Sequence, residues 1–126
     1  MSNTDYNDNV KENFLNPKNM GEMKNPDGEG MIGNIKCGDI LKIMINVEDN
    51  KIKDIKFQTF GCAAAIASSS MLTQLAIGRT LDEAYEISND DVLNKLGGLP
   101  SIKIHCSNLA ADALKKAIDN YRDKIK

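Results

Sequence analysis

Three cysteines, one histidine and one aspartate are the residues whose types could do metal or sulfur chemistry together. Cys37, Cys62 and Cys106 lie 25 and 44 residues apart. His105 directly precedes Cys106, and Asp39 follows Cys37 by two positions. Thiolate, imidazole and carboxylate groups all bind metals, and thiolates are also the nucleophiles of sulfur transfer. A single cysteine is more often a small core residue and no Cys-x-x-Cys pair is present, so the prediction of metal or sulfur chemistry depends on the set.

The composition predicts one soluble domain over residues 1–126. The chain is 41% hydrophobic and 27% charged, which is typical of a globular protein. An odd number of cysteines cannot all pair, so we expect reduced thiols in a cytoplasmic protein. The net charge of −2 and the absence of Trp argue against a nucleic-acid partner. The chain shows neither a signal peptide nor a run of about 18 apolar residues, which argues against a membrane partner.

Three strand-like segments must position the first two cysteines. We expect strands over Met31–Cys37, Ile40–Val47 and Lys51–Phe60, joined by short turns. Short connections of this kind make an antiparallel meander. The first and third strands then run in the same direction, so their ends share one edge of the sheet. This topology brings Cys37 and Cys62 together.

The first 30 residues are predicted to form a helix and a connector. Tyr6, Val10 and Phe14 make a weak helical stripe that ends at Asn16-Pro17. A flexible connector rich in Gly and Pro follows, up to Gly30.

The rest of the chain is predicted to be helical. A helix over Ala63–Ile77 stops before Gly78, and two capping-box patterns begin short helices at Thr80 and Ser88. A final helix has an apolar stripe from Ala110 to Tyr121 that should pack on the sheet. Strands followed by helices favour an α+β fold: a three-stranded antiparallel β-meander packed against C-terminal and flanking helices.

The cysteines fall at the boundaries of these elements. Cys62 and Cys106 precede predicted helices, and a helix N-terminus stabilises a thiolate. Gly38 and Gly61 have no side chain, so the backbone beside two of the cysteines leaves room for an ion or a partner's reactive sulfur.

Three motifs occur in order along the chain. They are Cys37–Asp39, Phe60–Ser70 and Lys103–Ser107, with Leu99-Pro100 before the last and Asn16–Asn19 near the start. They resemble the motifs of the IscU family, the NifU amino-terminal type of iron-sulfur cluster assembly scaffolds, and the resemblance covers nearly the whole chain. The resemblance implies a SufE/NifU-like fold.

The resemblance also implies a site and a set of partners. It places Cys37, Asp39, Cys62, His105 and Cys106 around one assembly site for a transient [2Fe-2S] cluster, built from Fe²⁺ and persulfide sulfur. The sulfur would come from a cysteine desulfurase of the IscS or NifS type, and the cluster would pass to apo iron-sulfur acceptor proteins. This makes the chain a scaffold and carrier rather than an enzyme. Ferredoxin, an Hsp70-type chaperone with its J-protein, and a second copy in a homodimer are the other implied partners.

Cys106 is our candidate for the persulfide acceptor within this site. The helix N-terminus favours its thiolate, and His105 can exchange protons beside it.

Two positions depart from the family's pattern. Its chaperone-recognition stretch is usually Leu-Pro-Pro-Val-Lys, whereas this chain has Leu99-Pro100-Ser101-Ile102-Lys103. The change weighs against docking of a dedicated chaperone. Asn13 stands where a histidine is common in the opening segment.

Other functions are consistent with the same residues. In a zinc-bound sulfur acceptor of the SufU type, the three cysteines with Asp39 or His105 would hold Zn²⁺. His105 and the lack of a long insertion between Cys62 and Cys106 favour the IscU branch. A thiol enzyme would use Cys106 as nucleophile and His105 as base, but adjacent side chains at a helix start point in different directions. A purely structural interaction module would have three unreactive thiols.

Overall fold

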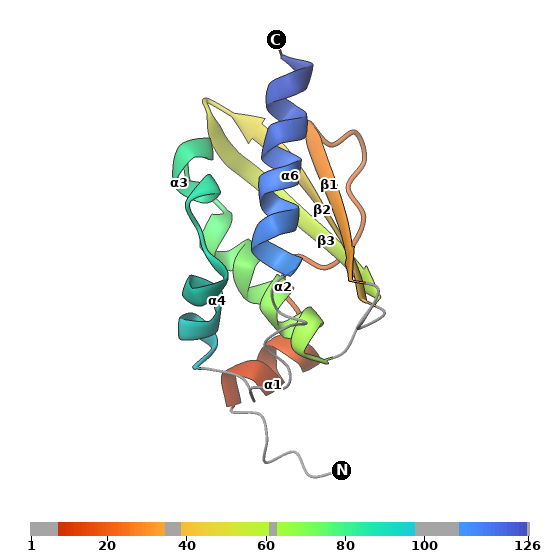
Figure 1. Cartoon of the computed structure of the whole chain (residues 1–126), viewed down its shortest axis with the longest axis vertical. Helices are drawn as coiled ribbons and strands as arrows, with labels where there is room; N and C mark the ends of the chain where they lie inside the picture. Colours follow the sequence, from red (N-terminus) through yellow and green to blue (C-terminus); the bar gives the residue numbers. More distant parts are fainter. Residues whose placement is uncertain (1–7, 35–38, 61–62, 98–108, 126) are drawn as a thin grey trace.

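A three-stranded antiparallel sheet has the described helices of residues 63–97 and 109–125 on one side (Figure 1). The computed structural model describes residues 8–34, 39–60, 63–97 and 109–125. The element order is α1 (Asp8–Leu15), β1 (Gly28–Asn34), β2 (Asp39–Glu48), β3 (Lys51–Phe60), α2 (Ala63–Ala76), α3 (Leu81–Tyr85), α4 (Asn89–Leu96) and α6 (Leu109–Lys124). The predicted α+β fold and the strand order of a meander are confirmed. None of the helices in these ranges is long and apolar enough to cross a bilayer.

The hairpin of β2 and β3 forms where the sequence predicts it. β3 has its predicted bounds, and β2 is one residue longer at each end. The turn residues Asp49 and Asn50 have φ angles of 55° and 60°, a left-handed conformation that these short polar residues tolerate. Leu41, Ile43 and Ile45 alternate along β2 and are buried on the helix side. The alternation of apolar residues is therefore a reliable guide to this part of the sheet.

β1 begins at Gly28, three residues earlier than predicted. Gly28–Gly30, which we assigned to the flexible connector, therefore belong to the sheet. A Cβ atom on Gly30 would lie 2.6 Å from the backbone oxygen of Ala113 and from the backbone nitrogen of Ala117. The missing side chain thus lets α6 pack directly on β1. Glycine predicts a loop, but here it serves close helix-strand packing. The predicted end of this strand at Cys37 lies outside the described residues.

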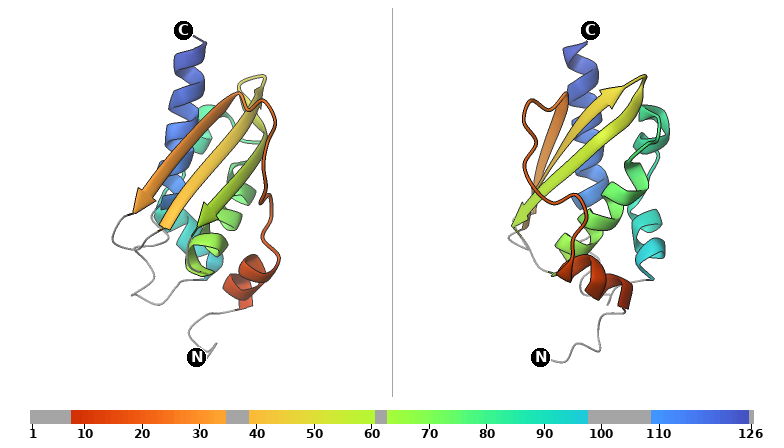
Figure 2. Two further views of the ribbon diagram at one scale, coloured as in Figure 1. Left: turned by 90° about the vertical axis from the view of Figure 1, so that its right-hand side faces the viewer. Right: turned by 180° about the vertical axis from the view of Figure 1, so that it is seen from behind.

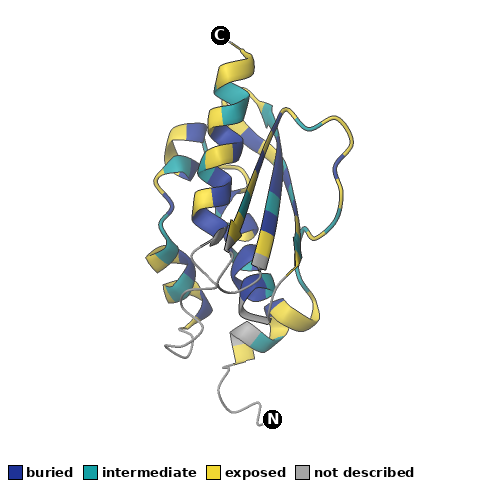
Figure 3. Cartoon of the chain, turned by 45° about the vertical axis from the view of Figure 1, so that its right-hand side comes forward, coloured by how far each residue is buried: buried dark blue, intermediate teal, exposed yellow. Residues whose placement is uncertain are grey.

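α6 buries its predicted apolar stripe against the sheet. Its inner side is dark blue and its outer side largely yellow in Figure 3. Leu114 and Ile118 have no exposed surface, whereas Asp112 and Asp119 of the same helix are exposed. The core between α6, α2 and the sheet is aliphatic apart from one aromatic ring, with these largest members: Leu41, Ile43, Ile45, Ile52, Ile55, Phe57, Leu72, Leu81, Leu96, Leu114 and Ile118.

Both predicted capping boxes are present. The Thr80 hydroxyl accepts a hydrogen bond from the Glu83 N–H at 3.1 Å, and the Glu83 carboxylate accepts one from the Thr80 N–H at 3.1 Å. The hydrogen bonds from the Thr80 backbone and hydroxyl lower the pKa of Glu83. Ser88 and Asp91 make the same pair of bonds at the start of α4. α2 ends at Ala76, one residue before the predicted end.

α1 forms as predicted, and among its described side chains the buried one is the polar Asn13. Phe14 is 40% exposed and Leu15 is 70% exposed, whereas Asn13 between α1 and α2 is only 7% exposed. Tyr6 and the side chain of Val10 lie outside the described residues. The surface of α2 beneath α1 is itself polar, because it presents Ser70 and Gln74. Asn13 therefore lies against a polar part of α2.

Candidate functional site

Asp39 is the one predicted ligand within the described residues. It is the first residue of β2, and its Cα partner is Asn34, the last described residue of β1. Cys37, Cys62 and the segment with His105 and Cys106 lie outside the described residues, as does the stretch Leu99–Lys103. Among the described residues, no three His, Cys, Asp or Glu side chains come together as a potential metal site. The structure therefore gives the frame of the predicted site rather than its ligand geometry.

The strand ends of this frame share one end of the sheet. Asn34 pairs with Asp39, and Ile40 pairs with Phe60, the last residue of β3. α2 begins three residues after Phe60, at Ala63. The described chain therefore leaves β1, enters β2, leaves β3 and enters α2 at the same end.

The first residue of α6 lies toward this end as well. A Cβ atom on Gly28 would meet Ala117 and Tyr121. A Cβ atom on Gly30 would meet Ala113 and Ala117. α6 therefore runs antiparallel to β1, and its N-terminus points toward the end of β1 (Figures 1 and 2). Each segment that contains a predicted cysteine ligand is therefore joined to a strand or helix that begins or ends at this end of the sheet.

Two helix N-termini at this end favour negative charge. α2 has 14 residues and α6 has 16, so both have a full macrodipole with its positive end at the first turn. The first turn of α2 contains no acidic side chain that would offset this charge. The first turn of α6 contains Asp112. The positive ends of these two helices stabilise anions such as thiolates and sulfide more than they stabilise additional cations.

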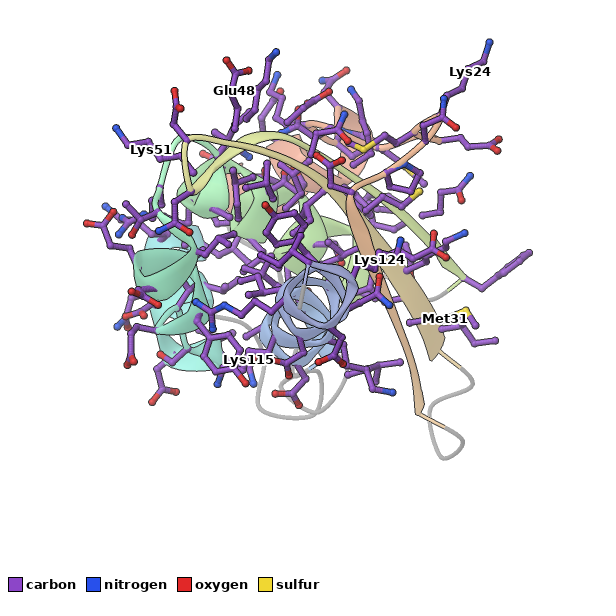
Figure 4. The ribbon with its side chains drawn as sticks, turned by 90° about the horizontal axis from the view of Figure 1, so that it is seen from above. Lys24, Met31, Glu48, Lys51, Lys115 and Lys124 are labelled. Atoms are coloured by element: carbon purple, nitrogen blue, oxygen red, sulfur yellow. The ribbon has the colours of Figure 1, made fainter. Side chains whose placement is uncertain are left out.

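An exposed apolar surface adjoins the same end of the sheet, on the face opposite α6. Phe60 is 79% exposed, Met31 60%, Ile40 46% and Met20 44%. These four residues line a hollow of about 540 Å³, and we refer to them as the outer patch. Figure 4 shows the Met31 side chain on the side of β1 that faces away from α6.

The sequence analysis missed the outer patch. The alternation of side chains between the two faces of a strand could have revealed this patch. Ile40 and Phe60 lie on the face opposite to the core residues of β2 and β3. A large exposed apolar patch on a protein surface marks a site of interaction.

The described groups with shifted pKa values lie away from this end. The negative charge of Asp119, then burial and the hydrogen bond to Asp119, raise the pKa of Tyr85 between α3 and α6. A hydrogen bond to Glu48 in the hairpin raises the pKa of Lys53. These shifts reflect surface pairs that hold elements together.

Comparison with known proteins identifies the class of this chain. A family model described as the NifU-like N terminal domain matches residues 5–126. The chain therefore belongs to the NifU-like N-terminal domain family, which confirms the predicted resemblance.

Two relatives whose names state a function narrow the class further. The iron-sulfur cluster assembly scaffold protein IscU 1 of Archaeoglobus fulgidus is 58% identical over 116 residues, covering 92% of this chain and 76% of the relative. The iron-sulfur cluster assembly enzyme IscU of Drosophila melanogaster is 46% identical over 123 residues, covering 94% of this chain and 79% of the relative. The match to IscU proteins thus extends over most of both chains.

A solved structure shares the fold. The SUF-system iron-sulfur cluster assembly scaffold protein from Fervidobacterium islandicum superposes with a TM-score of 0.78, covering 94% of this chain and 99% of the other. The two sequences are 22% identical, so this likeness concerns the fold alone. It agrees with the predicted NifU-like architecture.

Proposed function

We propose that this chain is a scaffold on which a [2Fe-2S] cluster is assembled from iron and persulfide sulfur and then passed to apo acceptor proteins. One observation carries the proposal: the ends of β1, β2 and β3 and the starts of α2 and α6 share one end of the sheet. All five proposed ligands are at Asp39 or in the segments between these ends. The 58% identical relative is named as such a scaffold.

The proposed ligand set suits temporary binding. Electron-transfer clusters are commonly held by four thiolates. Here Cys37, Cys62 and Cys106 supply three thiolates, and Asp39 and His105 complete the iron coordination by turns. A carboxylate or an imidazole can be protonated or displaced more readily than a thiolate, so the cluster can leave. Iron and sulfide are therefore the substrates of this site.

Sulfur enters by thiolate attack on a persulfide. The Cys106 thiolate attacks the outer sulfur of the desulfurase persulfide, a new S–S bond forms, and the desulfurase thiolate leaves. Reduction of the transferred sulfur to sulfide takes two electrons, one from an Fe²⁺ that becomes Fe³⁺ in the cluster and one from a ferredoxin-type donor, and it restores the Cys106 thiolate. The positive end of α6 and proton exchange with His105 support the thiolate form.

We propose that the cysteine desulfurase, the sulfur donor, binds to the outer patch. Ile40 follows Asp39 directly, and Phe60 precedes the Gly61-Cys62 pair. A protein that delivers sulfur to this end must cover the neighbouring surface. Ile40→Glu should weaken binding of the desulfurase about tenfold. The matched control is Ile77→Glu, which changes a similarly exposed isoleucine after α2, next to the start of β3. Equal binding by both variants would exclude the patch.

Anaerobic reconstitution with ferric iron and sulfide tests the ligand set. Cys→Ser at any of the three positions should abolish the visible charge-transfer absorption and the bound sulfide. Full absorption in one variant would remove that cysteine from the set. Iron, zinc and sulfide counts on protein purified without air separate the scaffold from the zinc-bound sulfur acceptor. One zinc and no sulfide per chain after reconstitution would favour the latter.

A further inference from the structure

Met31 is the most exposed methionine among the described residues. It is 60% exposed on β1, and Figure 4 shows its side chain on the face of the sheet that carries the outer patch. Met44 belongs to the same face, because it alternates with the buried Ile43 and Ile45 of β2. Met44 is only 1% exposed. This face therefore presents one methionine to solvent and shields another.

A lysine lies directly beside Met31 on the neighbouring strand. Lys42 is the Cα partner of Met31 on β2, and both residues line the hollow of about 540 Å³ at the outer patch. The Lys42 ammonium group pairs with the Glu29 carboxylate at 3.7 Å, and both side chains are partly exposed. An ammonium group has more than one N–H donor, so Lys42 can donate to a further acceptor. The thioether of Met31 is itself a weak acceptor.

Oxidation by a peroxide turns this thioether into a strong acceptor. Hydrogen peroxide transfers one oxygen atom to the sulfur: an S–O bond forms, the O–O bond breaks, and the other oxygen leaves as water. The sulfur loses two electrons and the peroxide gains them. The product is methionine sulfoxide, a polar group that dedicated reductases convert back to the thioether. An exposed methionine in an apolar patch is thus a reversible chemical switch of surface polarity.

We propose that Met31 is a reversible oxidation site that controls binding of the sulfur donor to the outer patch. The proposal depends on the proposed binding of the cysteine desulfurase to the same patch. The Met31 sulfoxide accepts a hydrogen bond from Lys42 and keeps a charged group beside the hollow. A protein that covers the patch must then bury the sulfoxide and the ammonium group together, which costs free energy. Peroxide also oxidises thiolates, so sulfur delivery slows when the product would be damaged.

Peptide mass spectrometry after treatment with hydrogen peroxide tests the oxidation site itself. The thiols of the full chain are first protected with methyl methanethiosulfonate, and dithiothreitol releases them afterwards without reducing sulfoxides. Met31 should be largely converted to the sulfoxide before Met44 is detectably oxidised, because burial keeps the peroxide away from Met44. Equal rates of oxidation at the two positions would overturn the proposal.

Affinity for a purified IscS-type cysteine desulfurase tests the consequence of oxidation. The peroxide-treated wild type should bind about tenfold more weakly than the untreated chain, and treatment with methionine sulfoxide reductases A and B should restore binding. Met31→Leu keeps an apolar side chain of similar volume that peroxide does not oxidise. Its affinity should be the same before and after treatment.

Met20→Leu is the matched control within the outer patch. Met20 is 44% exposed, but it is paired with Phe57 in an isolated bridge rather than with a lysine. Peroxide should therefore weaken binding of Met20→Leu as much as it weakens binding of the wild type. A loss that disappears in Met20→Leu and persists in Met31→Leu would assign the effect to Met20 and overturn the proposal.

Ile40→Glu separates failure of this proposal from failure of the proposed binding surface. If Ile40→Glu weakens desulfurase binding but oxidation of the wild type does not, the outer patch is the binding surface and the role of Met31 is wrong. If Ile40→Glu binds as tightly as the wild type, the binding surface is wrong, and control of binding by Met31 is overturned with it.

Discussion

α6 and α1 are both helices, yet their described buried side chains are of opposite kinds. α6 buries Leu114 and Ile118 completely and lies directly on two glycines of β1. α1 exposes Leu15 and buries Asn13. Apolar packing of the first kind resists opening, whereas hydrogen bonds of the second kind exchange readily with water. The comparison predicts that stability depends more on the described apolar residues of α6 than on the exposed apolar residues of α1.

The largest effect is expected from a matched pair of leucine truncations. Leu114→Ala should lower the free energy of unfolding by about 3 kcal/mol, because it leaves a cavity in the fully buried stripe of α6. Leu15→Ala should change it by less than about 0.5 kcal/mol, since this side chain on α1 is 70% exposed. Urea unfolding followed by circular dichroism measures both. Equal losses would contradict the contrast between the two helices.

A methyl group on β1 tests the close approach of α6. Gly30→Ala should destabilise the protein by about 1–3 kcal/mol, because the new Cβ would meet backbone atoms of α6 that cannot move separately. Met31→Ala, one residue later on the opposite face, serves as the control and should have a much smaller effect. If Gly30→Ala were as stable as the wild type, the direct contact between helix and strand would be wrong.

The sequence predicted the sheet and the apolar packing of α6 well. The period of α6, the alternation in β2, the bounds of β3 and both capping boxes depend on local patterns that the fold retains. Gly28 and Gly30 misled the prediction because their role depends on a helix more than 80 residues later. The burial of Asn13 was not predicted, because burial of a polar residue depends on partners on α2. Nonlocal contacts of this kind leave no periodic signal.

The candidate site was predictable only as topology. Antiparallel connections were expected to bring the ends of the first and third strands to one edge, and the register places Asn34, Asp39 and Phe60 together. The exposed apolar residues beside them were missed because alternation was used to find the core rather than the opposite face.

An exposed capping box should contribute less than the apolar stripe of α6. Thr80→Ala should cost about 1 kcal/mol, and Thr80→Ser should retain most of the stability because it keeps the hydroxyl. Since the pKa of Glu83 is lowered on folding, its contribution is present above the unfolded pKa and is lost as the pH falls through the folded value. The difference between wild type and Thr80→Ala should therefore shrink below about pH 4. A difference that grows in acid would contradict this assignment.

The outer side of α6 provides the smallest expected effect. The Tyr85 hydroxyl donates to Asp119 at 3.3 Å, and its ring lies 5.6 Å from the Arg122 guanidinium. Tyr85→Phe should change stability at neutral pH by less than Thr80→Ala does. The pKa of Tyr85 is raised, so its contribution is present below the unfolded pKa and is lost as the pH rises through the folded value. Stability curves of the two proteins should converge above about pH 10, and divergence there would contradict the pairing.

Cluster transfer tests the central claim most directly. The reconstituted chain is mixed without air with an apo ferredoxin, and the cluster absorption of each protein is followed after rapid separation. We expect the acceptor to gain the cluster that this chain loses, and Asp39→Ala to form a cluster but transfer it several-fold more slowly. Asp90→Ala, an exposed change on α4, should transfer at the wild-type rate. A cluster that stays on the wild-type chain in the presence of excess acceptor would contradict the scaffold function.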